Sequence, residues 1–389
     1  MKICACIAEY NPFHLGHLKH LDYIKSELGA EKLIVIMSGN FTQRGEPAVI
    51  DKYTRAKHAV LAGADLVLEL PTVFATAGAE VFAKGAVNLL CGLGIDAGLC
   101  FGVESGEKGD FISLAKAMSD ESKEFKRTLK ENLEKGVSLA KAKYLTVQDL
   151  GGNFDEKLLS SPNNILGVEY TKALIGKDAN IEIYPMLRTG DHNDTNFKKG
   201  ITSASSIRQV LKTGKIKKLK KALPPFTYRD LKEYPFGFDK LIMAKVFSTS
   251  AEEMSKLPDC TEGLENRIKA LSKDNRTVDA LVEKVSTKRY TMARVRRILT
   301  ANLLGITDSL VKDCLKSELY AKVLAVNSNS KDIISMLSST SKIPILTRKS
   351  DISLLKKTAL KSFEIDVLAG DLYGLIKNEK QNEHQMLII

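Results

Sequence analysis

The sequence of 389 residues contains no tryptophan, few aromatic residues (6%) and only six cysteines. The cysteines are scattered: none form a CxxC pair that could hold a metal, and they are too sparse for a secreted disulfide scaffold. We therefore expect reduced thiols in a cytoplasmic protein. No uninterrupted apolar run reaches about eighteen residues, and no basic N-terminal segment precedes an apolar core, so the sequence predicts neither a membrane span nor a signal peptide.

Acidic residues are scarce in one half of the chain. Residues 1–200 carry 24 Lys and Arg against 26 Asp and Glu, a balance of −2, whereas residues 201–389 carry 34 against 21, a balance of +13. Concentrated positive charge most often serves to neutralise phosphates, although a basic surface that only confers solubility gives the same count. With 44% hydrophobic residues, the chain can bury a sizeable core and form two domains.

The most informative stretch is the first twenty residues. Ile3–Ala8 is a short apolar run that predicts a buried strand ending in a polar turn. Apolar residues at three- and four-residue steps over 18–28 then predict a helix. His14 and His17 therefore stand where a strand leads into a helix N-terminus, which favours anions because the first N–H groups have no partner within the helix.

The two histidines flank Gly16, whose missing side chain would let a flat ligand approach the backbone. Their N–H groups could donate hydrogen bonds to nucleotide phosphates and stabilise charge on the α-phosphorus as pyrophosphate leaves. Taken singly, each histidine is more often a helix cap or a surface residue. Zinc is the alternative ligand for the pair, but no acidic or cysteine partner stands at ligand spacing.

The rest of the chain alternates strands and helices before becoming mostly helical. Apolar runs predict strands at 31–38, 65–70, 97–102 and 181–188, and helical spacing predicts helices at 56–64, 75–90, 165–174, 262–271, 277–285, 293–304 and 309–324. A short α/β element is expected around 333–345 and 363–375. Alternation over the first hundred residues indicates a doubly wound parallel sheet, and Pro224-Pro225 marks a candidate domain boundary.

A second polar constellation, Met37–Gly45, follows the second predicted strand. Its small hydrogen-bonding residues, with Ser38 and one arginine among them, suit a small anionic substrate or a triphosphate at the carboxyl edge of the sheet. The segment could equally be a plain loop. Lys52 and Arg55 lie at the start of the next helix. The sequence is equally compatible with side chains that reach the same cleft and with side chains on the surface.

Further candidates follow the later strands. Gly102 could offer its backbone N–H to a ligand, since no side chain is in the way, or it could simply be a turn glycine. Asn163 and Asn164 precede a helix, which either would be expected to cap. Arg188 ends a predicted strand and is the best phosphate clamp in its region. Residues 202–208 form a serine-rich turn followed by Arg208, suited both to capping a helix and to holding phosphates.

Two basic clusters lie in the C-terminal half. The first is lysine-rich and spans 212–221, where a solvated face is the usual meaning. The second, 288–297, places Arg294 and Arg297 on one helical face, where they could bridge phosphates of an RNA backbone, and Tyr290 could stack on a base. We expect RNA contact at the second cluster more than at the first.

His14-Leu15-Gly16-His17 resembles the HxGH signature of the nucleotidyltransferase superfamily. The longer string from Ile7 to His17, taken with Met37–Gly45, closely resembles the tRNA(Met) cytidine acetate ligase family, and the resemblance extends over essentially the whole chain. It implies a Rossmann-like catalytic domain over 1–221 and a mostly helical, basic tRNA-binding domain over 222–389. Residues 202–208 resemble the second signature of the superfamily, which closes over the β- and γ-phosphates.

The resemblance also implies an activity and a site. The enzyme would activate acetate with ATP as acetyl-adenylate, releasing pyrophosphate, and acetylate the wobble cytidine of elongator tRNA(Met) to N4-acetylcytidine. Mg²⁺ would bridge the phosphates, although no acidic cluster identifies its ligands. Neither DNA nor a membrane is an expected partner. The implied catalytic residues are His14, His17, Ser38 and Arg188; those implied for ATP are Ile7, Ala8, Glu9, Tyr10, Asn11, Pro12, Phe13, His14, Leu15, Gly16, His17, Leu18, Lys19, His20, Gly102, Asn163, Asn164, Arg188, Ser205 and Arg208; those implied for RNA are Lys217, Lys218, Arg289, Arg294, Arg296 and Arg297.

Two alternatives stay open from the sequence. One is an adenylyltransferase that acts on a small phosphorylated molecule, for which the basic helical half is unnecessary. The other is a non-catalytic tRNA-binding protein that holds ATP as a structural ligand. No residue stands out as the general base that would take the amine proton of cytidine, and the oligomeric state cannot be inferred.

Overall fold

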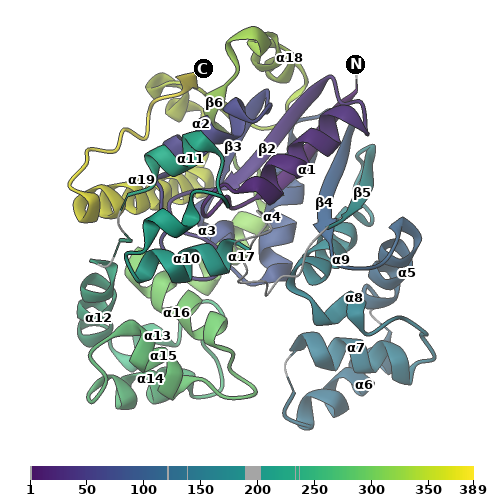
Figure 1. Ribbon diagram of the computed structural model, residues 1–389. Helices are drawn as coiled ribbons and strands as arrows, with labels where there is room; N and C mark the ends of the chain where they lie inside the picture. Colours follow the sequence, from purple (N-terminus) through teal and green to yellow (C-terminus); the bar gives the residue numbers. More distant parts are fainter. Residues whose placement is uncertain (1, 121, 138, 189–202, 233, 236) are drawn as a thin grey trace.

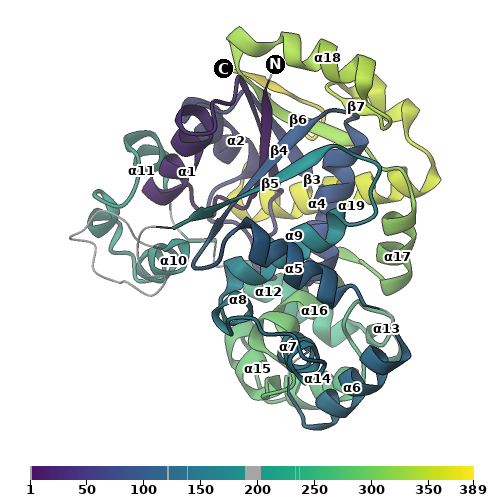
Figure 2. The same cartoon turned by 90° about the vertical axis from the view of Figure 1, so that its right-hand side faces the viewer.

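The structure, a computed structural model, describes residues 2–120, 122–137, 139–188, 203–232, 234–235 and 237–389. Their strands form one eight-stranded sheet in the order β5-β4-β1-β2-β3-β6-β7, with β8 pairing to β6 (Figures 1 and 2). The pairings are parallel except that between β3 and β6. The strands are β1 Ile3–Ala8, β2 Lys32–Ser38, β3 Leu66–Leu70, β4 Ala97–Val103, β5 Ile181–Leu187, β6 Ala321–Val326, β7 Ile345–Leu346 and β8 Leu387–Ile388.

The sheet is buried on both faces, which explains why its strands are continuous apolar runs. Alternate residues of one strand enter different cores: Ile3 and Ala5 of β1 pack on one face, while Cys4 and Cys6 pack on the other. Helices α1 (Leu15–Ser26) and α2 (Lys52–Leu61) cover the second face. The doubly wound, Rossmann-like sheet predicted from the alternation of strands and helices is therefore confirmed.

Most of the remaining helices pack on the first face or extend below the sheet. Figure 1 shows two helical groups beneath it, one formed by α5–α8 and the other by α12–α16. Their bounds are α3 Thr72–Ala75, α4 Ala79–Gly92, α5 Lys108–Met118, α6 Lys123–Glu134, α7 Leu139–Asp149, α8 Lys157–Ser160, α9 Pro162–Leu174, α10 Ala204–Lys212, α11 Pro225–Asp230, α12 Phe238–Ser248, α13 Ala251–Met254, α14 Leu264–Ser272, α15 Val278–Val285, α16 Met292–Leu304, α17 Asp308–Lys316, α18 Asp332–Thr340 and α19 Lys357–Lys377. Within the described ranges, no helix combines the length and apolar character needed to cross a membrane.

The helix predicted over 309–324 is wrong in its second half. Helix α17 ends at Lys316, and Ala321–Val326 forms strand β6, which pairs antiparallel with β3. A short continuous apolar run does not distinguish a buried strand from a buried helix, and here pairing with the sheet decides. Because β6, β7 and β8 come from beyond residue 222, the sheet is not confined to residues 1–221. The assignment of separate catalytic and tRNA-binding domains stays a prediction.

Candidate active site

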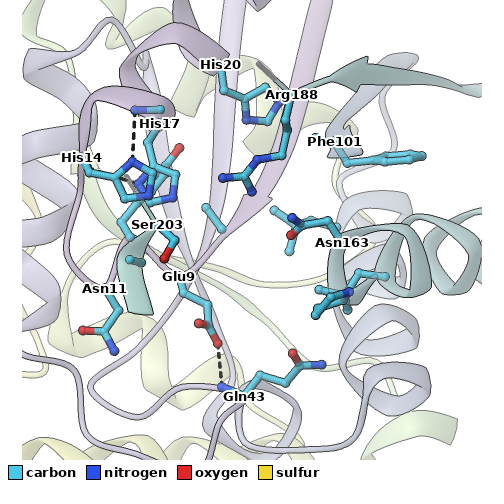
Figure 3. Close-up of a pocket in the computed structure, with 18 of the residues that line it drawn as sticks. Glu9, Asn11, His14, His17, His20, Gln43, Phe101, Asn163, Arg188 and Ser203 are labelled. Carbon is cyan, nitrogen blue, oxygen red and sulfur yellow. Dashed lines mark hydrogen bonds between the residues drawn. The ribbon is translucent and has the colours of Figure 1, made fainter. Parts of the chain in front are cut away.

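The turn after β1 builds one wall of a pocket of about 240 Å³. His14 caps α1, because its Nδ1 accepts the N–H of Gly16 at 3.0 Å, and the N–H of His14 donates to Nδ1 of His17 at 3.2 Å. The two rings stack with centroids 3.7 Å apart and line the pocket (Figure 3). Since both Nδ1 atoms accept backbone N–H groups, the proton of each neutral ring lies on Nε2.

The charge state of the neighbouring imidazoles follows from their burial. Burial lowers the pKa of His17 well below its ordinary value, and His14, Arg188 and His20 lower it further. Burial, with Arg188 beside it, lowers the pKa of His20 to about 4. Both rings are therefore neutral at pH 7, and His17 offers Nε2–H as a donor to an acceptor such as a phosphate oxygen.

The lowered pKa of His20 predicts acid sensitivity. The free energy of unfolding should fall as the pH drops from about 6.5 towards 4. An unfolded histidine takes up its proton near pH 6.5, whereas folded His20 does so only near pH 4. The unfolded state thus binds more protons in this interval, and His20 contributes a loss of at most about 1.4 kcal/mol per pH unit. Urea unfolding at pH 7, 6 and 5 checks this: His20→Gln should show a shallower decline, and parallel declines would refute it.

Four basic side chains line the same pocket: Lys19, Arg44, Arg188 and Arg208. Arg188 follows β5, and its N–H donates to the carbonyl of Val103 at 2.8 Å. Its guanidinium, which points into the pocket, has no hydrogen bond or ion pair with any residue that the structure describes. A Cβ at Gly102 would lie 3.1 Å from Cγ of Arg188, so this glycine makes room for the arginine stem.

Arg208 is held from two sides. Its Nη1 donates to the carbonyl of Asn11 at 2.8 Å, and its Nη2 donates to Oγ of Ser205 at 3.3 Å. Ser203 caps α10 by accepting the N–H of Ser206 at 3.2 Å. The serine-rich turn therefore both starts a helix and orients an arginine on the pocket, as its sequence allowed. Residue 202 of this segment and the stretch after Arg188 lie outside the described residues.

The two asparagines of α9 have different surroundings. Neither caps the helix: Ser161 does, by accepting the N–H of Asn164 at 3.3 Å. Asn164 is fully buried, and its side chain accepts from the N–H of Glu104 at 2.9 Å and donates to Oγ of Ser105 at 2.9 Å. Asn163 lines the pocket instead, and its Nδ2 donates to Glu104 at 2.5 Å. Of the two, Asn163 is thus the one placed to meet a ligand.

The loop after β2 meets the pocket through Gln43 and Arg44. Ser38, at the end of β2, is buried outside the pocket lining, and its Oγ has no hydrogen-bond partner among the described residues. The pocket also lacks the side chains of several residues predicted to hold ATP. These are Pro12, Phe13, Leu15, Leu18 and Asn164, whereas Ile7, Ala8, Glu9, Tyr10, Asn11, His14, Gly16, His17, Lys19, His20, Gly102, Asn163, Arg188, Ser205 and Arg208 do line it.

Lys52 and Arg55 lie neither in the cleft nor on the surface, so both readings of the sequence are wrong. The Arg55 guanidinium is fully buried and donates to the carbonyls of Glu9, at 2.6 Å, and Ser38, at 3.0 Å. It therefore joins the carboxyl ends of β1 and β2. Lys52 is buried against Glu69 at 2.8 Å and Glu383 at 2.5 Å.

The predicted RNA-binding residues fall into two groups. Lys217 and Lys218 are exposed on the 3₁₀ turn Ile216–Leu219. The arginines of 288–297 are largely engaged with the protein itself. Arg289 pairs with Glu262, Arg294 donates to the carbonyl of Asp259 at 2.7 Å, Arg296 pairs with Asp279 at 2.5 Å, and Arg297 is mostly buried with Asp259 at 3.9 Å.

Sequence reasoning missed the apolar walls of the pocket. Phe101 and Tyr170 pack together with ring centroids 5.8 Å apart, and both line the cavity with other residues not singled out from the sequence. Those residues are Phe82, Pro162, Leu166 and Met186. Phe101 lies within a strand, and Tyr170 and Leu166 lie within a helix. Nothing in their spacing separates them from ordinary core residues, so the sequence carried no signal that could have identified them.

A parallel α/β sheet with paired histidines and clustered cations at its carboxyl edge is the arrangement of a nucleotide-binding enzyme. The family model for HIGH Nucleotidyl Transferase matches residues 1–386, which defines the class. The chain is 38% identical to the tRNA(Met) cytidine acetate ligase of Clostridium acetobutylicum, over 97% of this chain and 96% of that one. It is also 38% identical to that of Acetivibrio thermocellus, over 96% and 94%. The chain therefore belongs to the tRNA(Met) cytidine acetate ligase family.

Solved structures agree with this assignment. The crystal structure of Thermotoga maritima TmcAL bound with alpha-thio ATP matches with a TM-score of 0.92 at 28% identity, covering 100% of both chains. The apo form of the same protein matches with a TM-score of 0.93 at 29% identity, also over 100% of both chains. The structural similarity thus extends over the full length of the chain, including the C-terminal strands β6–β8.

Proposed function

We propose that this protein is an ATP-dependent ligase that converts acetate to acetyl-adenylate and then acetylates the wobble cytidine of elongator tRNA(Met). The observation that carries the proposal is that His14, His17 and Arg188 meet around one pocket, in a chain similar over nearly its whole length to ligases of that name. Acetate is a poor acyl donor until AMP becomes its leaving group. A pocket rich in phosphate donors supplies that activation.

Each side chain has a role in the proposed adenylation. The Nε2–H groups of His14 and His17 donate to phosphate oxygens and stabilise the charge that develops as pyrophosphate leaves. Arg188 and Arg208 bind the same phosphates through paired N–H groups. Phe101 and Tyr170 provide an apolar wall beside Asn163, which suits the adenine end of the nucleotide.

Mg²⁺ is proposed to enter with the phosphates. Among the described residues, no group of three or more His, Cys, Asp or Glu side chains could hold a metal ion. Mg²⁺ keeps several waters and is commonly held by substrate phosphates with one or two carboxylates. A pocket lined mainly by phosphate-binding cations therefore fits a metal that arrives with ATP.

The test incubates the purified protein with ATP, carbon-14 acetate and bulk tRNA, and then digests the tRNA to nucleosides. We expect label in N4-acetylcytidine, and acetate-dependent exchange of pyrophosphate into ATP without tRNA. Exchange that requires a phosphorylated small molecule instead of acetate would indicate the small-molecule adenylyltransferase. Binding of tRNA and ATP with no exchange under any condition would indicate the non-catalytic protein.

Lys217 and Lys218 are proposed to contact tRNA phosphates, because they are exposed and neither forms an ion pair within the described ranges. The double variant Lys217→Ala/Lys218→Ala should bind tRNA more weakly at low salt and reduce the slope of log affinity against log salt by about one per lysine. Filter binding from 50 to 300 mM KCl measures both. Lys126→Ala/Lys130→Ala on α6 is the matched control; equal losses in the two double variants would contradict a specific contact.

A further inference from the structure

Glu9 carries the one carboxylate among the described residues that line the pocket. It directly follows β1, and its backbone carbonyl accepts from Arg55 at 2.6 Å. Its Oε1 accepts the N–H of Gln43 at 2.7 Å (Figure 3), whereas its Oε2 has no hydrogen-bond or ion-pair partner within the described part of the chain. The fold thus anchors Glu9 once through its backbone and once through its side chain, and leaves one carboxylate oxygen for a ligand.

The transfer step needs a proton acceptor, because the exocyclic amine of cytidine must lose a proton to become an amide. The paired imidazoles do not offer one: the Nδ1 atoms of His14 and His17 already accept backbone N–H groups. His20 is engaged elsewhere, because its Nε2 lies 3.3 Å from Sγ of Cys100.

The other titratable groups on the pocket hold their protons. Burial raises the pKa of the Tyr10 and Tyr170 phenols, and Lys19, Arg44, Arg188 and Arg208 are cations at neutral pH. Among the described residues that line the pocket, Glu9 therefore supplies the carboxylate with an oxygen left to accept a proton.

We propose that Glu9 is the general base of the acetyl-transfer step, an inference that rests on the proposed function. The cytidine N4 attacks the carbonyl carbon of acetyl-adenylate and forms the C–N bond. Oε2 of Glu9 takes the proton from N4. The bond between the acyl carbon and the phosphate oxygen breaks, and AMP departs with that electron pair. The proton on Glu9 then passes to solvent.

The two half-reactions separate this role from a role in binding ATP. Glu9→Gln keeps a carbonyl oxygen for the N–H of Gln43 but cannot accept a proton. We expect acetate-dependent pyrophosphate exchange within about twofold of the unsubstituted protein, and single-turnover transfer from the preformed acetyl-adenylate complex to tRNA slowed by about 10²-fold or more. Glu9→Asp should recover part of the transfer rate. Glu364→Gln, an exposed carboxyl on α19, makes the same charge change and should alter neither step.

Each outcome of this experiment is informative. Transfer by Glu9→Gln within twofold of the unsubstituted rate would overturn the assignment, as would equal losses in exchange and transfer, which would indicate a role in binding or folding. A pH–rate profile for transfer that loses its acidic limb in Glu9→Gln would support it. If the unsubstituted protein shows no acetate-dependent exchange, the proposed function itself fails, which is distinguishable from a failure of Glu9 alone.

Discussion

His14→Ala and His17→Ala are each expected to slow acetate-dependent exchange of pyrophosphate into ATP by about 10²- to 10³-fold. Each substitution removes an imidazole whose Nδ1 accepts a backbone N–H and whose Nε2 faces a ligand as a donor. Removal of one preorganised donor that stabilises developing charge costs this much in other enzymes. The measurement is the exchange rate at saturating ATP and acetate, with the tRNA dissociation constant determined in parallel. We expect tRNA affinity within about twofold of the unsubstituted protein.

The matched control is His384→Ala. His384 lies in the C-terminal segment outside the pocket and packs with its ring centroid 6.1 Å from that of Phe363. Its loss should leave exchange unchanged within twofold. Exchange at the unsubstituted rate in both His14→Ala and His17→Ala would remove the proposed role of the paired imidazoles.

The second large effect is on stability. Glu383→Gln is expected to lower the free energy of unfolding by about 3–5 kcal/mol, because it leaves two buried lysines to share one carboxylate. Lys52 and Lys322 contact both Glu383 and Glu69, and all four side chains are almost fully buried. Burial lowers the pKa of Lys52, but Glu383 and Glu69 outweigh it and raise that pKa overall, so the lysine stays charged. Urea unfolding at pH 7 gives the difference.

Glu379→Gln is the comparison for this variant. Glu379 belongs to the same C-terminal segment and pairs with Lys232 at 2.7 Å, but both side chains are exposed. Its loss should cost about 0–1 kcal/mol. Similar losses in the two variants would show that the buried cluster does not hold the C-terminal segment to the sheet.

The local patterns of the N-terminal half were sufficient to predict the parallel sheet and the strand-to-helix turn that bears His14 and His17. They depend on residues close together in the chain, as periodicity and capping do. The surroundings of Lys52 could not be predicted in this way. Its partner Glu383 lies 331 residues further along the chain, and only the folding of the C-terminal segment onto β6 brings the two together.

Charge patterns located the cations of the pocket better than they described the surroundings of the arginines in 288–297. Arg188 and Arg208 line the pocket as expected, since the ends of parallel strands and the starts of helices meet at one edge of the sheet. Arg294 and Arg296 share a helix, as predicted, but acidic groups and carbonyls from other segments occupy their guanidinium groups. A run of arginines in a sequence does not reveal which anions the fold brings to it.

The most direct test of the account follows the oxygen atoms of acetate. The protein is supplied with ATP, tRNA and acetate labelled in both oxygens with oxygen-18, and the AMP product is analysed by mass spectrometry. If the carboxylate attacks the α-phosphorus, AMP carries one acetate oxygen and the acetyl group on tRNA keeps the other. Acetylated tRNA formed together with AMP that contains no oxygen-18, or with ADP as the nucleotide product, would contradict an acetyl-adenylate intermediate.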